Sequence, residues 1–191
     1  MSDKNYPRDL VGYGPMPPTA NWPGGARVCL SLVVSIEEGG ENSILHGDAQ
    51  SESILSEVAG LSPVVGAREV NIESMYEYGS RAGYWRVMRA LNERELPTTI
   101  YAVAMAIERN PAVAEAAVAA GFEVMSHGYR WIDYSNIPID LEREHMYQAI
   151  EIITRICGSR PLGWCTGRPS MNTRKLIVEE GGFLYDSDSL S

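Results

Sequence analysis

The chain has 191 residues, of which 45% are hydrophobic and 21% are charged, and these values are ordinary for one globular domain with a sizeable core. Its net charge of −9 at pH 7 argues against a nucleic-acid partner, because phosphate binding requires clustered Lys and Arg side chains. No apolar run is long enough to cross a bilayer, so we also expect no membrane partner.

The chain is predicted to start with an irregular arm over residues 1–25, followed by one β/α domain over residues 26–191. Proline and glycine recur throughout the arm and disfavour helix and strand. Its first ten residues are polar and lack the apolar stretch of a signal peptide. None of the three cysteines, Cys29, Cys157 and Cys165, belongs to a CxxC pair, so we expect two or three buried thiols in a cytoplasmic protein.

Five segments are predicted to be strands. The first, residues 28–36, is almost continuously apolar and β-branched, which is typical of a strand buried on both faces. The others are predicted at residues 98–103, 122–126, 162–165 and 183–185. Because helical patterns alternate with these strands, the sequence predicts a parallel α/β sheet with crossover helices.

Helices are predicted between the strands from their caps and apolar spacing. Ser80 is placed to cap a helix whose apolar residues recur at helical spacing, at Tyr84, Val87, Met88 and Leu91. Asn110 and Pro111 begin the next helix, which Gly121 closes. Two further helices are predicted at residues 140–157 and 173–180, each followed by a glycine.

The unusual polar residues follow these strands directly. In a parallel β/α array, chemistry is carried by the loops that leave the carboxyl ends of the strands. Those positions hold Glu37 and Glu38, then His127, then the stretches 166–168 and 186–188. We therefore expect these side chains to meet at one catalytic mouth.

The acidic pair and the arginine each have two interpretations. Glu37 and Glu38 are either a general base with an anchor for substrate or metal, or a solvated turn helped by Gly39 and Gly40. Arg168 is either a clamp for a carbonyl or carboxylate group or a surface arginine.

Among the histidines, His127 is either functional or a structural histidine that ends a strand. His46 is placed to border the site, and His145 is predicted to lie on the surface of its helix. A catalytic zinc usually takes three protein ligands, but Glu38 and His127 are the only obvious candidates, because Trp131 stands where another ligand is expected. We predict no cofactor, with residual zinc at Glu38 and His127 as the alternative.

Three stretches resemble motifs of the polysaccharide deacetylase (NodB-type) superfamily. Residues 34–39 (VSIEEG) resemble its TFDDG motif, residues 126–131 (SHGYRW) its second motif, and residues 160–168 (RPLGWCTGR) its third. More narrowly, the chain is similar to a branch of that superfamily, the PuuE-type allantoinases. This similarity covers essentially the whole chain and rests on residues 5–14, 37–42, 45–48, 74–83 and 180–188.

The resemblance implies hydrolysis of a C–N bond in a small-molecule substrate, the hydantoin ring of allantoin, to give allantoate in purine breakdown, with little or no dependence on metal. It implies a distorted (β/α) barrel of the polysaccharide deacetylase type. Mapped onto this sequence, the catalytic residues are Glu37 as the base with Glu38 and His127, and the residues that contact substrate are Trp131, Trp164 and Arg168.

Family members continue into later strands and a further His-containing motif. We therefore expect a C-terminally truncated chain with about five parallel strands of an incomplete barrel, and we expect a homo-oligomer. The alternatives are a metal-dependent polysaccharide or chitin deacetylase of carbohydrate metabolism and a catalytically inactive truncated homologue.

Overall fold

The structure, a computed structural model, describes residues 8–189, and the contacts divide the chain into two units, Met1–Ser31 and Leu32–Ser191. Residues 8–31 of the first unit contain a 3-10 turn at Pro23–Gly25. The Asp9 carboxylate accepts hydrogen bonds from the N–H groups of Val11 and Gly12 at 2.9 and 3.0 Å. The arm over residues 1–25 and the domain from residue 26 remain predictions.

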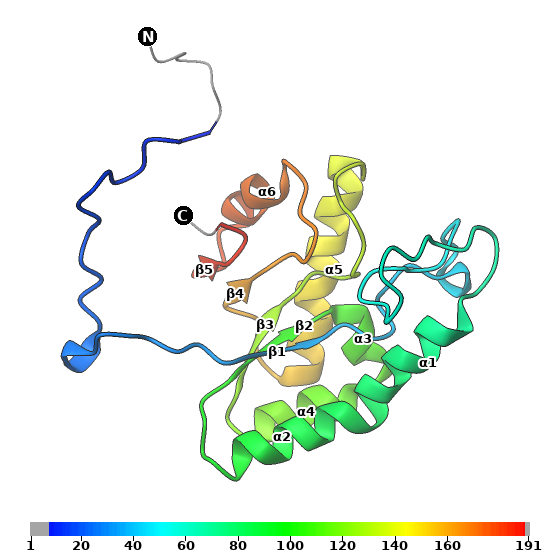
Figure 1. Ribbon diagram of the computed structural model, residues 1–191, viewed down its shortest axis with the longest axis horizontal. Helices are drawn as coiled ribbons and strands as arrows, with labels where there is room; N and C mark the ends of the chain where they lie inside the picture. The colour runs from blue at the N-terminus through cyan, green and yellow to red at the C-terminus, as the bar shows by residue number, and fades with distance from the viewer. Residues whose placement is uncertain (1–7, 190–191) are drawn as a thin grey trace. The chain divides into compact units, whose positions relative to one another are not determined.

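The second unit is built on five parallel strands in the order β1-β2-β3-β4-β5 (Figure 1). Their bounds are Val33–Ile36, Thr99–Ala102, Glu123–Ser126, Gly163–Trp164 and Tyr185–Asp186. Ile36 pairs with Ala102, and Ala102 pairs with Ser126, so the carboxyl ends of three strands are level. The predicted α/β fold, with five parallel strands of an incomplete barrel, is confirmed.

The first strand is shorter and more exposed than predicted. Val28 and Leu30 are 77% and 80% exposed, and the pairing with β2 begins only where Thr99 N–H donates to the Leu32 carbonyl at 3.0 Å. Residues 28–31 belong to the first unit. An apolar, β-branched run indicates strand propensity, but a strand extends only as far as a neighbouring strand is present to pair with it, and the run does not show where that pairing ends.

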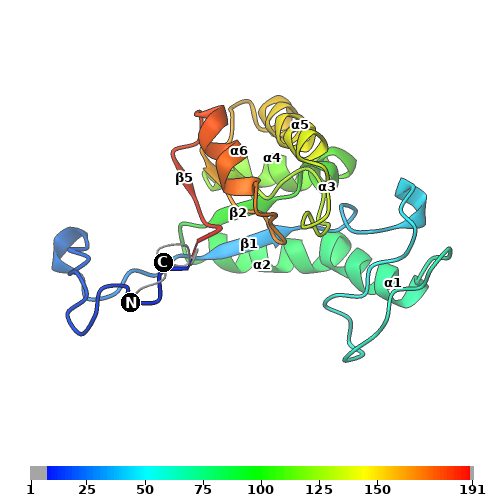
Figure 2. The same cartoon turned by 90° about the horizontal axis from the view of Figure 1, so that it is seen from above.

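Helices connect and cover the strands. Their bounds are α1 Val70–Tyr78, α2 Tyr84–Asn92, α3 Ala104–Arg109, α4 Pro111–Ala119, α5 Ile139–Cys157 and α6 Thr173–Glu180. Helices α3, α4 and α5 pack together (Figure 2), and the Tyr84 hydroxyl of α2 donates to the Val113 carbonyl of α4 at 2.6 Å. The short helix α3 was not predicted, because it follows β2 without a turn signal.

The helix before β2 starts earlier than predicted. Helix α1 begins at Val70, where the Glu69 side chain accepts a hydrogen bond from Asn71 N–H. A π-helical turn, Gly79–Gly83, joins α1 to α2, and the hydroxyl of Ser80 donates to the Glu77 carbonyl at 3.2 Å. Ser80 is therefore not a cap: the glycines at both ends of this turn, Gly79 and Gly83, adopt helical angles, and the helical backbone continues through them.

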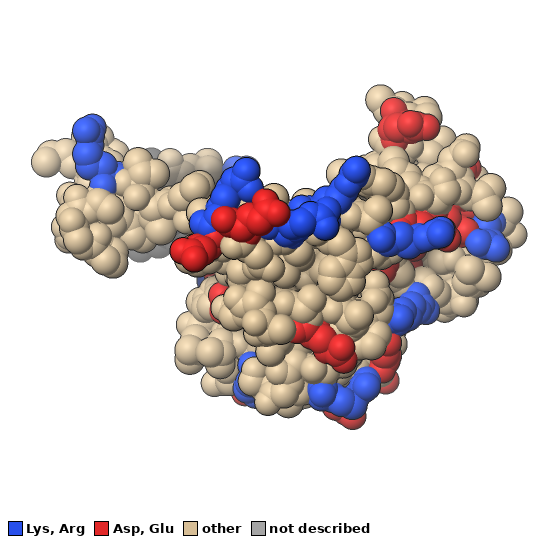
Figure 3. Space-filling model, turned by 90° about the horizontal axis from the view of Figure 1, so that it is seen from below, with Lys and Arg blue, Asp and Glu red and all other residues tan. Residues whose placement is uncertain are grey.

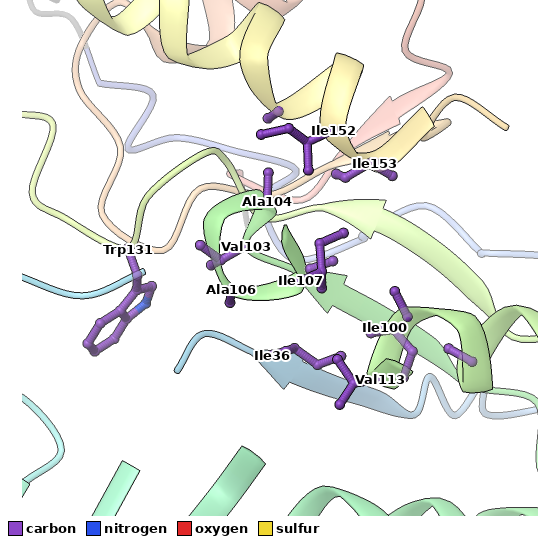
Figure 4. Packing of buried hydrophobic residues seen from close by; sticks show 14 of the residues in the cluster. Ile36, Ile100, Val103, Ala104, Ala106, Ile107, Val113, Trp131, Ile152 and Ile153 are labelled. Atoms are coloured by element: carbon purple, nitrogen blue, oxygen red, sulfur yellow. The ribbon is translucent and has the colours of Figure 1, made fainter. Parts of the chain in front are cut away.

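The core is formed by residues of strands β1–β4 and of helices α2–α6. Ile36, Ile100, Ile107 and Ile153 belong to one buried cluster, which fixes the strand ends that carry the polar residues (Figure 4). Trp131 belongs to the same cluster but lies beyond the carboxyl end of β1. Among residues 8–189, no helix is long and apolar enough to span a membrane. Basic and acidic side chains are interspersed on the face shown in Figure 3.

Candidate active site

A glutamate and a histidine meet at the carboxyl ends of two strands. Glu37 follows β1 and His127 follows β3, and His127 N–H donates to the Ala102 carbonyl of the strand between them at 2.8 Å. Glu37 Oε1 lies 3.2 Å from His127 Nε2, and the two side chains are 21% and 6% exposed. The strand order thus brings together two residues that are far apart in the sequence, as predicted.

The hydrogen bond made by the other ring nitrogen of His127 shows which of the two nitrogens carries a proton. His127 Nδ1 lies 2.7 Å from the Cys165 carbonyl oxygen, just after β4. Because a carbonyl oxygen only accepts hydrogen bonds, Nδ1 carries a proton and Nε2 faces Glu37. A proton on either Glu37 Oε1 or His127 Nε2 can therefore form a hydrogen bond to the other atom, which suits acid–base chemistry.

Glu38 lies in a different environment from Glu37. Its carboxylate accepts from Glu37 N–H at 3.2 Å and lies against the Cα atom of Gly79, where a Cβ atom would collide with it. Burial raises the pKa of Glu38 above its ordinary value, and the charges of Glu37 and Glu41 add to this shift. Two adjacent carboxyl groups in unlike environments can take opposite roles, one as base and one as acid.

Glu37 and Glu38 line one cavity. Its lining residues come from strand ends, the loop before α1, helix α1 and the loop after β3: Ser35, Glu37, Glu38, Glu41, Leu55, Tyr76 and Trp131. Trp131 N–H donates to the Gly40 carbonyl at 2.9 Å, which fixes its backbone at the cavity. The structure therefore brings Trp131 to the position from which it can form an apolar wall.

Gly167 packs closely against this site. A Cβ atom at this position would lie 2.8 Å from Trp131 Nε1 and 3.2 Å from His127 Nε2. Any side chain at this position would displace the indole or the imidazole ring, so glycine is required here.

Arg168 is not placed as a clamp for substrate. Its Nη2 donates to Glu52 Oε2 at 2.8 Å and to the Trp131 carbonyl at 2.6 Å, and its guanidinium carbon lies 4.5 Å from the centroid of the Trp131 ring. Both interpretations from the sequence, a substrate clamp and a surface arginine, miss this partly buried ion pair. The partner, Glu52, lies 116 residues earlier.

Trp164 and His145 also differ from their predictions. Trp164 is buried, donates from Nε1 to the Thr166 hydroxyl at 2.7 Å, and lines a different cavity from Glu37. His145 lines that same second cavity, with its ring 5.0 Å from Tyr129 and its Nδ1 3.0 Å from the Tyr134 hydroxyl. It is half-buried rather than on the helix surface, because α5 turns this face toward the two tyrosines.

His46 borders a neighbouring hollow that shares Glu38, Glu41 and Tyr76 with the first cavity. His46 Nε2 lies 2.6 Å from Arg109 Nη1. Burial lowers the pKa of His46, and the charge of Arg109 adds to this shift.

The cysteines are free, and Cys29, in the first unit, is exposed. Cys157 and Cys165 are half-buried. Burial and then the charge of Asp188 raise the pKa of the Cys165 thiol to about 12, which makes it a poor nucleophile.

The described residues do not fit a three-ligand zinc site. Across residues 8–189, no three side chains of His, Cys, Asp and Glu are grouped so that they could hold a metal ion. Glu38 and His127, the pair considered for residual zinc, would need a further ligand, and the Trp131 indole next to them offers no donor lone pair. The prediction that the protein has no cofactor stays a prediction.

Several residues at the cavity were not predicted from the sequence. Leu55, Tyr76 and Ser35 line it with the glutamates, and none of them follows a predicted strand. Glu41 stood in one of the stretches that carry the resemblance but was given no role. Tyr76 could be placed at the cavity only if helix α1 was known to begin at Val70, because the start of the helix determines which side chains face the strands.

The acid–histidine pair lies at the carboxyl ends of parallel strands, which is where enzymes built on parallel β/α sheets carry their active sites. The chain belongs to the polysaccharide deacetylase family, whose model, described as Polysaccharide deacetylase, matches residues 66–182. That family is hydrolytic.

Two solved structures are similar over nearly the whole chain. PuuE allantoinase is 57% identical with a TM-score of 0.93, over 97% of this chain and 61% of that one. A "probable Polysaccharide deacetylase" from Pseudomonas aeruginosa PAO1 is 56% identical with a TM-score of 0.92, over 96% of this chain and 61% of that one.

A curated relative supports the same family. The "Putative polysaccharide deacetylase" of Schizosaccharomyces pombe is 42% identical over 177 residues, which are 90% of this chain and 55% of the relative. The chain thus spans between 55% and 61% of the length of these three proteins.

Proposed function

We propose that this chain carries the acid–base residues of an enzyme that hydrolyses a cyclic amide, the hydantoin ring of allantoin, to give allantoate. The observation that carries the proposal is the contact of 3.2 Å between Glu37 Oε1 and His127 Nε2, beside a cavity walled by Trp131. Similarity to PuuE allantoinase supports this choice of substrate. A flat ring stacked near an indole suits the apolar wall.

In the proposed reaction, a water molecule attacks a ring carbonyl carbon. The Glu37–His127 pair takes one proton from this water as the new C–O bond forms. Glu38, whose pKa is raised by burial, supplies a proton to the ring nitrogen as the C–N bond breaks. The new carboxylic acid then returns a proton to Glu38, and the proton held by the pair passes to solvent. The product is a carboxylate with an open ring.

Substitution of the base tests this proposal. In the purified chain, Glu37→Gln keeps the shape of the side chain but removes its basicity, so we expect allantoate formation to fall by about 10²- to 10⁴-fold. Glu57→Gln, which changes an exposed glutamate outside the cavity, is expected to leave the rate unchanged. A folded wild-type chain without turnover would contradict the proposal, and turnover that survives Glu37→Gln would contradict the choice of base.

A second candidate is a metal-dependent deacetylase that acts on N-acetylated sugars. The observation that favours it is the 56% identity to the "probable Polysaccharide deacetylase" of Pseudomonas aeruginosa PAO1. Release of acetate from N-acetylglucosamine oligomers, dependent on stoichiometric zinc and without allantoate formation, would favour this candidate over the first.

A further inference from the structure

A buried glutamate anchors the loop that reaches the cavity before α1. Glu52 is only 4% exposed, and its N–H donates to the Asn42 carbonyl at 2.9 Å. Its Oε1 accepts from the N–H groups of Ser53 and Ile54 at 2.9 and 3.1 Å, and its Oε2 accepts from Asn42 Nδ2 at 2.9 Å. The carboxylate thus organises the backbone that immediately follows it.

Arg168 joins this loop to the wall of the cavity. Its Nη2 bonds both to Glu52 Oε2 and to the Trp131 carbonyl, while the guanidinium group stacks over the Trp131 ring. One arginine therefore couples the position of the loop to that of the indole. Arg restrained by a carboxylate and an aromatic face loses little freedom on binding.

Leu55 is the residue that this anchor presents. The Tyr76 hydroxyl donates to the Ile54 carbonyl, and Leu55, the next residue, has a φ of 60°. The left-handed region is unfavourable for a bulky residue, and since Leu55 is 69% exposed, the restraint on it comes from the hydrogen bonds of the preceding residue, Ile54. Leu55 lines the same cavity as Glu37, Glu38 and Trp131.

We propose that Ser51–Leu55 forms a roof that sets the substrate specificity of the Glu37 cavity, with Leu55 contacting the substrate ring and the Glu52–Arg168 pair positioning the roof opposite Trp131. The roof and the indole would enclose a small, flat, neutral ring from two sides. Ligands with bulky groups on the ring would be rejected by Leu55. This inference rests on the proposed function for the identity of the ring.

Leu55→Ala tests the contact. We expect KM for allantoin to rise by about 10-fold with kcat little changed, because an apolar contact is lost and the acid–base residues stay in place. Hydantoins with a bulkier ring substituent should gain in kcat/KM relative to allantoin. Val65→Ala, which shortens an exposed side chain in the same loop outside this cavity, should change neither quantity. A Leu55→Ala enzyme with the KM and substrate preference of the wild type would overturn the proposal.

The anchor is tested without turnover, by amide hydrogen exchange in the full chain. Glu52→Ala removes the acceptor for two N–H groups, so exchange at Ser53 and Ile54 should accelerate by about 10-fold or more. The Ser51 amide, which donates to the Val64 carbonyl, is the internal control. Glu52→Gln, which keeps an acceptor oxygen, should show a smaller acceleration and a raised KM with kcat retained. Unchanged exchange at Ser53 and Ile54 in Glu52→Ala would overturn the positioning role.

The two proposals fail in different ways. If the wild type turns over allantoin but Leu55→Ala behaves as the wild type, the roof is wrong and the function stands. If the wild type neither binds nor turns over allantoin, the function is wrong and so is the substrate contact of Leu55, while the exchange experiment still decides whether Glu52 holds the loop.

Discussion

Glu38 is a side chain of the cavity whose charge state the fold alters. Burial and the charges of Glu37 and Glu41 raise its pKa above the ordinary value of 4.5. A raised folded-state pKa means that the folded protein is favoured while the group is protonated, and that this advantage is lost as pH rises through the folded pKa. We therefore expect Glu38→Gln to unfold at a higher temperature than the wild type at pH 7, by a few degrees.

The difference in unfolding temperature between Glu38→Gln and the wild type should shrink as the pH falls below 4.5, because Glu38 then becomes protonated in the unfolded chain as well as in the folded one. Thermal unfolding followed by circular dichroism between pH 4 and pH 8 measures this, with Glu57→Gln as the exposed control. A difference that is constant across this range would contradict the assigned pKa direction.

At the residue scale, position after a strand predicted Glu37 and His127 because adjacent parallel strands place their ends together whatever the loops do. The same argument could not predict what Arg168 contacts. Its partner, Glu52, lies in a loop without periodicity, and the energy of the pair depends on burial that no local pattern encodes. The expected position of Trp164 at the Glu37 cavity was wrong for a related reason. An aromatic residue in a strand points to one face of the sheet or the other, and the motif does not show which.

At the scale of elements, the π-helical turn Gly79–Gly83 lies beside the acid. Such turns often occur at functional sites, and here Gly79 leaves the space that the Glu38 carboxylate occupies. Gly79→Ala should stabilise the helical backbone by roughly 0.5–1 kcal/mol, yet displace Glu38. We expect turnover to fall by about 10-fold or more with no loss of stability, measured by kinetics and urea unfolding.

Gly83→Ala is the matched control for this substitution. Gly83 closes the same turn, but an added Cβ atom would make ordinary contacts of 3.5–3.7 Å with Tyr78. It should therefore keep full activity. Equal losses of activity in the two variants would show that the turn, rather than the space at Glu38, is what matters.

The helices were predicted best where the sequence carries a clear signal at their ends. Helix α6, Thr173–Glu180, lies where predicted, since a glycine in the left-handed conformation ends it at Gly181. Helix α1 was missed, because glycines at positions 79 and 83 are ordinary signals for a break but here continue the helix through a π turn. Local propensity cannot distinguish a break in the helix from a π turn, because the difference depends on how Glu38 packs against Gly79.

At the scale of the whole second unit, one ion pair ties the loop after β1 to the loop after β3. Arg130 is 8% exposed and donates to both Asp48 carboxylate oxygens, at 2.9 and 2.6 Å. Burial acts to raise the pKa of Asp48, but the hydrogen bonds from Arg130 and from Ser43 N–H outweigh it, so this pKa lies below its ordinary value of 3.8. We expect Asp48→Asn to lower the free energy of unfolding at pH 7 by about 2 kcal/mol.

Because the folded-state pKa is lowered, the contribution of Asp48 is present above pH 3.8 and is lost as pH falls through the folded pKa. Urea unfolding at pH 7 and at the lowest pH where the wild type stays folded checks this sign. Asp140→Asn removes an exposed ion pair on α5 and should change little. A gap between wild type and Asp48→Asn that widens in acid would contradict the prediction.

The hydrogen bond from His127 Nδ1 to the Cys165 carbonyl has a consequence for how this site can vary. In many histidine sites a carboxylate side chain orients the ring, and a single substitution removes it. Here the orienting atom belongs to the main chain of the residue that follows β4. Every amino acid at position 165 presents the same carbonyl oxygen, so no point substitution of the orienting residue deletes this partner. The tautomer of His127 therefore depends on the pairing of β3 with β4, and it persists for as long as these two strands remain in register.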